Sequence, residues 1–316
     1  MRRGAWILSA GLLALLALAA CEEIPQEAPP PAPVPVAPSA SPRPQPTEQS
    51  DTSLRTRTYY ARRQADLETQ GLLRTDGGGP DTPFDADMLA ANFEEIVFYD
   101  EYASGIGSRA GPAGHLRRWN SPVRVDVEFG ASVPAQQRRE DATQVASFAS
   151  RLGRITGHPV MRSQTGVNFH VLIMGEDDRT QLGNRLRELA PSMSDETIEF
   201  FKELPLTIEC SVLAFSAPGD PYAYTKAIAM IRAELPELLR LSCIHEEIAQ
   251  GLGPANDSPD ARPSIFNDDD EFALLTNHDE LLLKMLYDPR LTTGMTIAEA
   301  RPVTRIIARE LTGQEL

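Results

Sequence analysis

A short segment around residue 247 carries polar side chains at spacings that could support chemistry. It contains Cys243, His245, Glu246, Glu247 and Gln250, and then Gly253, Asn256 and Asp257. Carboxylates act as general bases or metal ligands, and amide oxygens also hold hard cations. On a helix Glu246 and Gln250 share a face, and Gly253 allows a sharp turn that can return Asn256 to that face. The segment therefore predicts a polar pocket beside a helix.

This spacing resembles the metal-binding helix of metzincin peptidases, H-E-x-x-H-x-x-G-x-x-H. The five fixed positions of that template fall on Glu246, Glu247, Gln250, Gly253 and Asn256. Of these five residues, only Glu247 and Gly253 match the residue type of the template. The following segment, 264–267, lies where these peptidases have a Ser-Ile-Met turn, with Phe266 in place of the methionine. The resemblance implies a zincin-like fold whose metal chemistry is lost or altered.

A second resemblance covers more of the chain. Shared features are Cys-x-x-Glu-Glu-x-x-Gln-x-Leu-Gly from Cys243, the Asn256–Asp257 pair and the Phe-Asn-Asp segment from Phe266. From about Phe93 to its C-terminus, the chain is similar to a bacterial lipoprotein family, domain-of-unknown-function family 2927. This resemblance supplies a family and a cell-envelope setting, but it implies no particular activity.

The replaced residues make a poor metal site in the metzincin frame. Zinc prefers imidazole nitrogen or thiolate, whereas this frame offers one carboxylate and two amide oxygens. Calcium accepts oxygen ligands but takes six to eight, so Asp257 or Asp260 would have to contribute. We therefore expect no cofactor, with weak zinc or calcium binding as the alternative. In that alternative Glu247 is the general base of an atypical metal-dependent peptidase.

A structural interpretation of the same residues is a buried hydrogen-bond network. Glu246, Glu247, Gln250 and Asn256 would lock the helix to the turn at 264–267, as a lost metal once did. His245 would belong to this polar set. Alternatively His245, His170 and His278 could form an unrelated zinc site, although a single histidine is more often part of the hydrogen-bonded structure.

The N-terminus has the pattern of a bacterial export signal. Arg2 and Arg3 precede an apolar run that ends Leu-Ala-Ala-Cys21, which resembles a lipobox. The resemblance implies cleavage before Cys21 and acylation of that cysteine with a diacylglyceryl group and a further chain such as palmitate. Glu22 resembles the sorting position of lipoproteins sent to the outer membrane, facing the periplasm. An ordinary signal peptide and an N-terminal membrane helix are the alternatives.

Composition and periodicity divide the chain into four parts. These are a signal peptide (1–20), a proline-rich tether (21–53), a helical segment with a glycine-rich loop (54–83) and a domain (84–316). Within the domain, strands are predicted at 123–129, 168–175, 211–216 and 224–233, and helices near 145–155, 178–203 and 235–251. The order predicts an α+β fold with a mixed sheet packed with helices, in which the motif helix follows the last strand.

The net charge bears on the kind of partner, and the cysteine content bears on the redox state of the compartment. The formal net charge is −15, and loss of Arg2 and Arg3 with the signal peptide makes it −17, which argues against a nucleic-acid partner. Cys210 and Cys243 are the only thiols left once Cys21 is acylated. An oxidising compartment predicts a disulfide between them, and two free buried cysteines are the alternative.

These observations lead to one preferred functional hypothesis. We expect a lipid-anchored pseudoenzyme with a non-catalytic domain that binds an envelope protein or peptide in the former substrate cleft, beside an edge strand. The alternatives are the metal-dependent hydrolase with Glu247 as base and a domain that only spaces other envelope components.

Overall fold

The computed structural model describes residues 49–99 and 113–314. The predicted signal peptide, Cys21 and nearly all of the tether lie outside the described residues. The helices are α1 (Asp51–Thr69), α2 (Ala86–Phe98), α3 (Ala135–Thr156), α4 (Arg179–Leu189), α5 (Asp195–Lys202), α6 (Glu237–Gln250), α7 (Asn277–Leu286) and α8 (Ile297–Thr312), with a 3-10 turn η1 (Glu176–Asp178). None of these helices combines the length and the apolar character that a membrane span requires.

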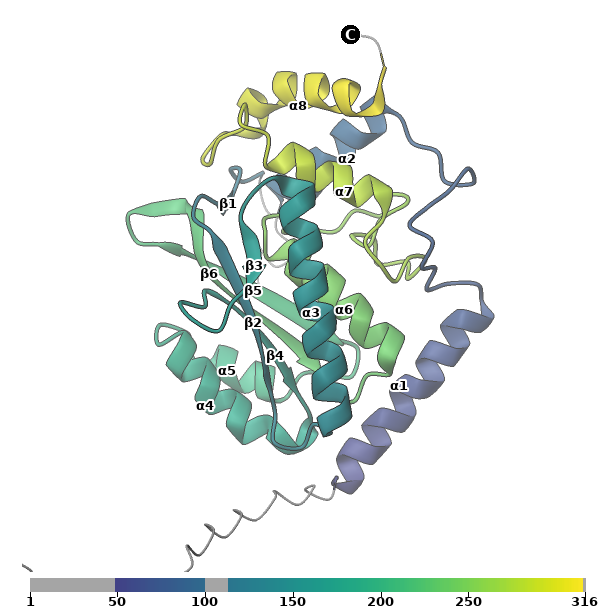
Figure 1. The fold of residues 1–316 in the computed structure, drawn as a ribbon, viewed down its shortest axis with the longest axis vertical. Coiled ribbons are helices and arrows are strands. Elements are labelled where there is room, and N and C mark those ends of the chain that lie inside the picture. The colour runs from purple at the N-terminus through teal and green to yellow at the C-terminus, as the bar shows by residue number, and fades with distance from the viewer. Residues whose placement is uncertain (1–48, 100–112, 315–316) are drawn as a thin grey trace, which may run out of the picture. The chain divides into compact units, whose positions relative to one another are not determined.

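Six strands form one mixed sheet (Figure 1). They are β1 (Arg118–Trp119), β2 (Val123–Phe129), β3 (Val160–Arg162), β4 (Phe169–Met174), β5 (Cys210–Ala217) and β6 (Asp220–Arg232). β3, β2, β4 and β6 lie side by side in that order and run parallel. β1 pairs with the start of β6, and β5 pairs antiparallel with β6 along most of its length. The predicted mixed α+β class is therefore confirmed.

Helices cover both faces of the sheet. In β4 alternate side chains point to opposite faces, so Phe169, Val171 and Ile173 join one core while Leu172 and Met174 join another. The first core is closed by α3 and α6, and the second by α4 and α5. Because β4 is apolar on both sides, it forms the centre of the domain.

The helix that carries the polar motif follows the last strand directly. Four residues, 233–236, separate the end of β6 from the start of α6. α3 begins before the helix predicted near 145–155 and ends at Thr156, and its C-cap Gly157 has a left-handed backbone (φ 67°), a conformation that favours glycine. These connections place α3 and α6 next to each other on the same face of the sheet, as Figure 1 shows.

A disulfide joins the edge of the sheet to the motif helix. Cys210 at the start of β5 is bonded to Cys243 in α6, with their Cα atoms 5.9 Å apart. The predicted disulfide is therefore confirmed. Further along β5 the pairing with β6 is irregular, with register shifts between Phe215 and Ala217.

α1 packs against the rest of the described chain through specific contacts. The Tyr60 hydroxyl donates to the carbonyl of Leu206, and the Ser53 hydroxyl donates to the carboxylate of Glu234. Arg63 donates to Glu209, the residue that precedes β5. The helical segment predicted before the domain is therefore attached to it.

Candidate functional site

A cleft of about 450 Å³ lies between β5 and α6. One side is the consecutive segment Thr207–Ala214, which includes most of β5. The other side is one face of α6, formed by Leu239, Ser242, Cys243, Glu246, Glu247 and Gln250. These helical residues recur at spacings of three and four, which places them on a common face. The cleft therefore runs along a strand and exposes the motif helix.

The structure brings most of the predicted polar set into this cleft. Glu246, Glu247, Gln250 and Asp257 all line it. The Gln250 amide donates to the Asp257 carboxylate over 3.0 Å. The sharp turn expected after the helix is present, because Gly253 has φ 145° and any Cβ there would lie 2.6 Å from the carbonyl oxygen of Arg117. The turn returns Asp257, rather than its neighbour Asn256, to the helix.

Two predicted site residues lie elsewhere. The Asn256 amide donates to the backbone carbonyl of Glu95 over 3.1 Å. His245 accepts a hydrogen bond from the Leu275 backbone N–H, and its ring stacks on Phe148 with centroids 4.0 Å apart. Neither residue is among the described residues that line the cleft. His245 packs α6 against α3 and the Leu275 segment, whereas Asn256 joins the loop after α6 to α2.

The zinc frame of the metzincin template does not fit this geometry. It requires metal ligands at Glu246, Gln250 and Asn256, but only the first two line the cleft, and the Asn256 amide is turned toward the Glu95 carbonyl. Two neutral amides with other partners and one carboxylate do not make a tetrahedral zinc site.

The histidines considered as a separate zinc site have separate partners. The His170 ring nitrogen Nδ1 lies 3.1 Å from a Glu128 carboxylate oxygen, on the α4 side of the sheet. The His278 ring nitrogen Nε2 lies 3.2 Å from the Asn92 amide. His245 bonds to Leu275, as described above. The structure does not bring these three rings together.

The turn at Ser264–Phe266 is held by α7. The Ser264 hydroxyl donates to one carboxylate oxygen of Asp279 over 2.5 Å, and the Ile265 N–H donates to the other over 3.0 Å. Phe266 is fully buried in the larger core. Asp279 therefore fastens this turn, while Gln250 and Asn256 bond to other groups.

The cleft has an excess of acidic side chains. Among the described residues that line it, six are acidic and two are arginines: Glu209, Glu246, Glu247, Asp257, Asp268 and Asp270, with Arg63 and Arg117. Arg63 from α1 donates to Glu209 and to Asp270. Burial raises the pKa of Glu209 above its usual range, although Arg63 opposes this shift. The balance of charge suits a positively charged ligand group.

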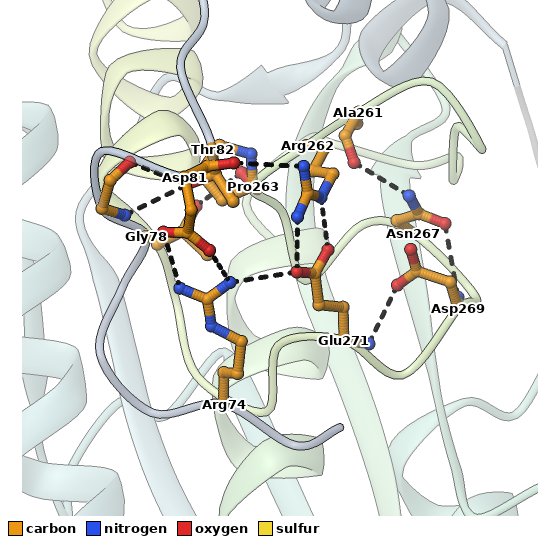
Figure 2. Close-up of polar contacts among 12 residues, drawn as sticks. Arg74, Gly78, Asp81, Thr82, Ala261, Arg262, Pro263, Asn267, Asp269 and Glu271 are labelled. Carbon is orange, nitrogen blue, oxygen red and sulfur yellow. Dashed lines mark hydrogen bonds and ion pairs between the residues drawn. The ribbon is translucent and has the colours of Figure 1, made fainter. Parts of the chain in front are cut away.

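Arginine side chains join two loops beside the cleft, one at residues 74–82 and the other at residues 261–271. As Figure 2 shows, Glu271 accepts from both Arg74 and Arg262, and Arg74 also bonds to Asp81. The Asp269 carboxylate accepts the backbone N–H of Glu271 within the same loop. The segment 268–271, whose Asp268 and Asp270 border the cleft, is thus held by cations from two other segments. Arg74 and Glu271 are 197 positions apart in the sequence, so no local pattern predicts the contact between them.

The fold and the cleft define a mixed α+β domain with an acidic groove between an edge strand and a helix. The chain belongs to the family described as "Protein of unknown function (DUF2927)", whose profile matches residues 86–306. The match includes the whole sheet and the motif helix and excludes α1. Neither the curated proteins nor the solved structures contain a match to the chain.

His245 predicts a pH dependence of stability. Burial is the larger of two causes that lower its pKa from 6.5 to about 3, and the charge of Arg151 is the other. The native ring therefore stays neutral in a range where the unfolded chain takes up a proton. Stability from this group is complete above pH 6.5 and is lost as the pH falls toward 3.

The expected size is about 2.5 kcal/mol of unfolding free energy lost between pH 7 and pH 4.5 from this group. Denaturant unfolding of the wild type and of His245→Gln at both pH values measures it. The variant does not titrate, so the difference in stability between the two proteins should shrink by that amount at the lower pH. An unchanged difference would show that the native ring is protonated at pH 4.5.

Proposed function

We propose that this protein is a lipid-anchored envelope protein with a non-catalytic, zincin-like domain that binds an extended segment of a protein or peptide partner. The bound segment of the partner lies in the cleft between β5 and α6. Acylated Cys21 holds the chain at the outer membrane, facing the periplasm. The tether separates the domain from the lipid surface.

The topology supports the zincin-like interpretation. β5 runs antiparallel beside β6, and β6 leads directly into the helix that carries the template positions. The donors at those positions support a non-catalytic role, because they do not form a zinc site. An extended ligand can occupy such a cleft without any reaction.

The outer edge of β5 carries this proposal. The Arg232 N–H donates to the Glu209 carbonyl, so residue 209 is a position at which hydrogen bonds connect β5 and β6. Hydrogen-bonded and non-hydrogen-bonded positions alternate along an antiparallel pair. The backbone groups of Cys210, Val212 and Ala214 therefore point to the outer edge. Among the described strands, β6 is the only one that pairs with β5.

This arrangement suits strand addition. A partner in an extended conformation would pair with the outward backbone groups of β5, and its side chains would alternate between the cleft and solvent. The acidic lining favours a partner with lysine or arginine at a position that faces Glu246. Backbone pairing supplies affinity, and charge supplies selectivity.

Val212→Pro tests the strand addition. Proline removes the outward N–H of residue 212 without removing a hydrogen bond between β5 and β6. The probes are linear peptides selected by the full chain from a displayed random library. We expect the selected peptides to be rich in lysine and arginine, and Val212→Pro to weaken their binding at least about tenfold, as expected for loss of one backbone contact.

Val212→Thr is the matched control, because it keeps both the β-branch and the N–H. It should bind the peptides as the wild type does. Equal binding by Val212→Pro would contradict strand addition. Incubation of the same peptides with the wild type and Glu247→Gln tests the non-catalytic role, and cleavage by the wild type alone would overturn it.

A further inference from the structure

Sulfur and carboxylate groups meet at the base of the cleft. The Cys210 sulfur and one carboxylate oxygen from each of Glu246 and Glu247 all lie within 4.8 Å of one another. The Cys243 sulfur is bonded to the Cys210 sulfur and therefore lies beside the same group. Cys243, Glu246 and Glu247 are three and four residues apart on α6, which puts them on one face. Four potential ligands from a strand and a helix therefore converge.

While the disulfide is intact, the two sulfurs cannot act as thiolate ligands for a metal ion. Metals bind the thiolate form of cysteine, and neither sulfur of a disulfide is a thiolate. A dithiol reductant can open the bond: two electrons and two protons convert Cys210 and Cys243 to thiols, and the reductant becomes a disulfide. Two thiols then stand beside two carboxylates.

We propose that the reduced protein binds one zinc ion through Cys210, Cys243, Glu246 and Glu247. Zinc displaces the two thiol protons, and each thiolate and carboxylate donates one electron pair. Two thiolates with two carboxylates complete a tetrahedral set. The inference is independent of peptide binding.

The geometry requires only small adjustments. A tetrahedral ion with zinc–sulfur bonds of about 2.3 Å holds its two sulfurs about 3.8 Å apart, which two cysteines released from a disulfide reach by side-chain rotation. The other ligand atoms, which lie within 4.8 Å of one another, must also reach the spacing of a tetrahedral set, about 3.3–3.8 Å. Both cysteines border the cleft, and Cys210 and Glu246 are partly exposed, so an ion can enter from solvent. This site uses both cysteines and does not use Gln250 or Asn256.

Zinc titration of the full chain carrying Cys21→Ala tests the proposal, because Cys210 and Cys243 are then the only cysteines. One sample stays oxidised, and the other is reduced with a phosphine and desalted without oxygen. We expect the reduced chain to bind one zinc ion at least about 100-fold more tightly than the oxidised chain, because thiolates supply most of the zinc affinity. Titration against a coloured chelator measures both affinities.

Cobalt provides a measurement that needs no further variant. A thiolate-to-cobalt charge-transfer band in the reduced chain alone would support the site, and its absence would overturn it.

Cys210→Ser and Cys243→Ser should each abolish tight zinc binding, and far-ultraviolet circular dichroism checks that they fold. Glu246→Gln and Glu247→Gln should each weaken binding at least about tenfold, whereas Glu196→Gln, on an exposed part of α5, should not. Equal affinity in the oxidised and reduced chains would refute the proposal.

Discussion

Replacing Asp279 with alanine is expected to lower the free energy of unfolding by about 4 kcal/mol, near the upper end of single-substitution effects. Asp279 is fully buried and accepts hydrogen bonds from Ser264, Ile265 and Thr276. Its removal leaves several buried donors without their acceptor, and each costs about 1–3 kcal/mol before the structure relaxes. Denaturant unfolding measures the difference.

Glu299→Ala is the matched control. Glu299 holds the same position in the capping box of α8 that Asp279 holds in α7, and it accepts from Thr296. It is solvent-exposed, so water can replace it as an acceptor and its loss should cost far less than the loss of Asp279. Similar losses in the two variants would show that Asp279 acts as an ordinary helix cap and does not fasten the turn at Ser264.

Loss of the disulfide is expected to lower the free energy of unfolding by about 3.5 kcal/mol. The bond closes a loop with a sequence separation of 33, and the chain-entropy model gives about this value for such a loop. The double variant Cys210→Ala, Cys243→Ala should show this loss in denaturant unfolding. The reduced wild type, kept free of metal, should show a similar loss.

Addition of the reductant to the double variant is the control and should have no effect. Zinc adds a second measurement, because it should restore stability to the reduced wild type and not to the double variant. If the reduced and oxidised wild type unfold at the same denaturant concentration, the disulfide does not constrain the unfolded chain as this prediction assumes.

Local patterns predicted much of the secondary structure. The alternation of polar and apolar residues predicts β2 at its observed bounds. The Thr-x-x-Asp and Thr-x-x-Glu spacings at Thr276 and Thr296 are local signals of the same kind for the starts of α7 and α8. β1 and β3 were not predicted because two or three residues show no periodicity. α2 was also missed, although Asp85 caps it and its apolar residues have helical spacing.

The site was predicted in part for the same reason. Helical spacing correctly put Glu246 and Gln250 on one face, and their cleft could not be predicted because β5 reaches α6 only through the pairing of distant strands. The position of Asn256 depended on a turn whose register no local pattern fixes. His245 is different: adjacent helical residues point about 100° apart, so its separation from Glu246 could have been expected.

The irregular end of β5 sets a limit on what the cleft can hold. Regular pairing with β6 covers Cys210 to Phe215, and the backbone changes direction in the next two residues. From Cys210 to Ala214 the outer edge offers about 16 Å of straight backbone at roughly 3.3 Å per residue. A bound segment would therefore have a footprint of about five residues, and a longer one would have to bend away before Ser216.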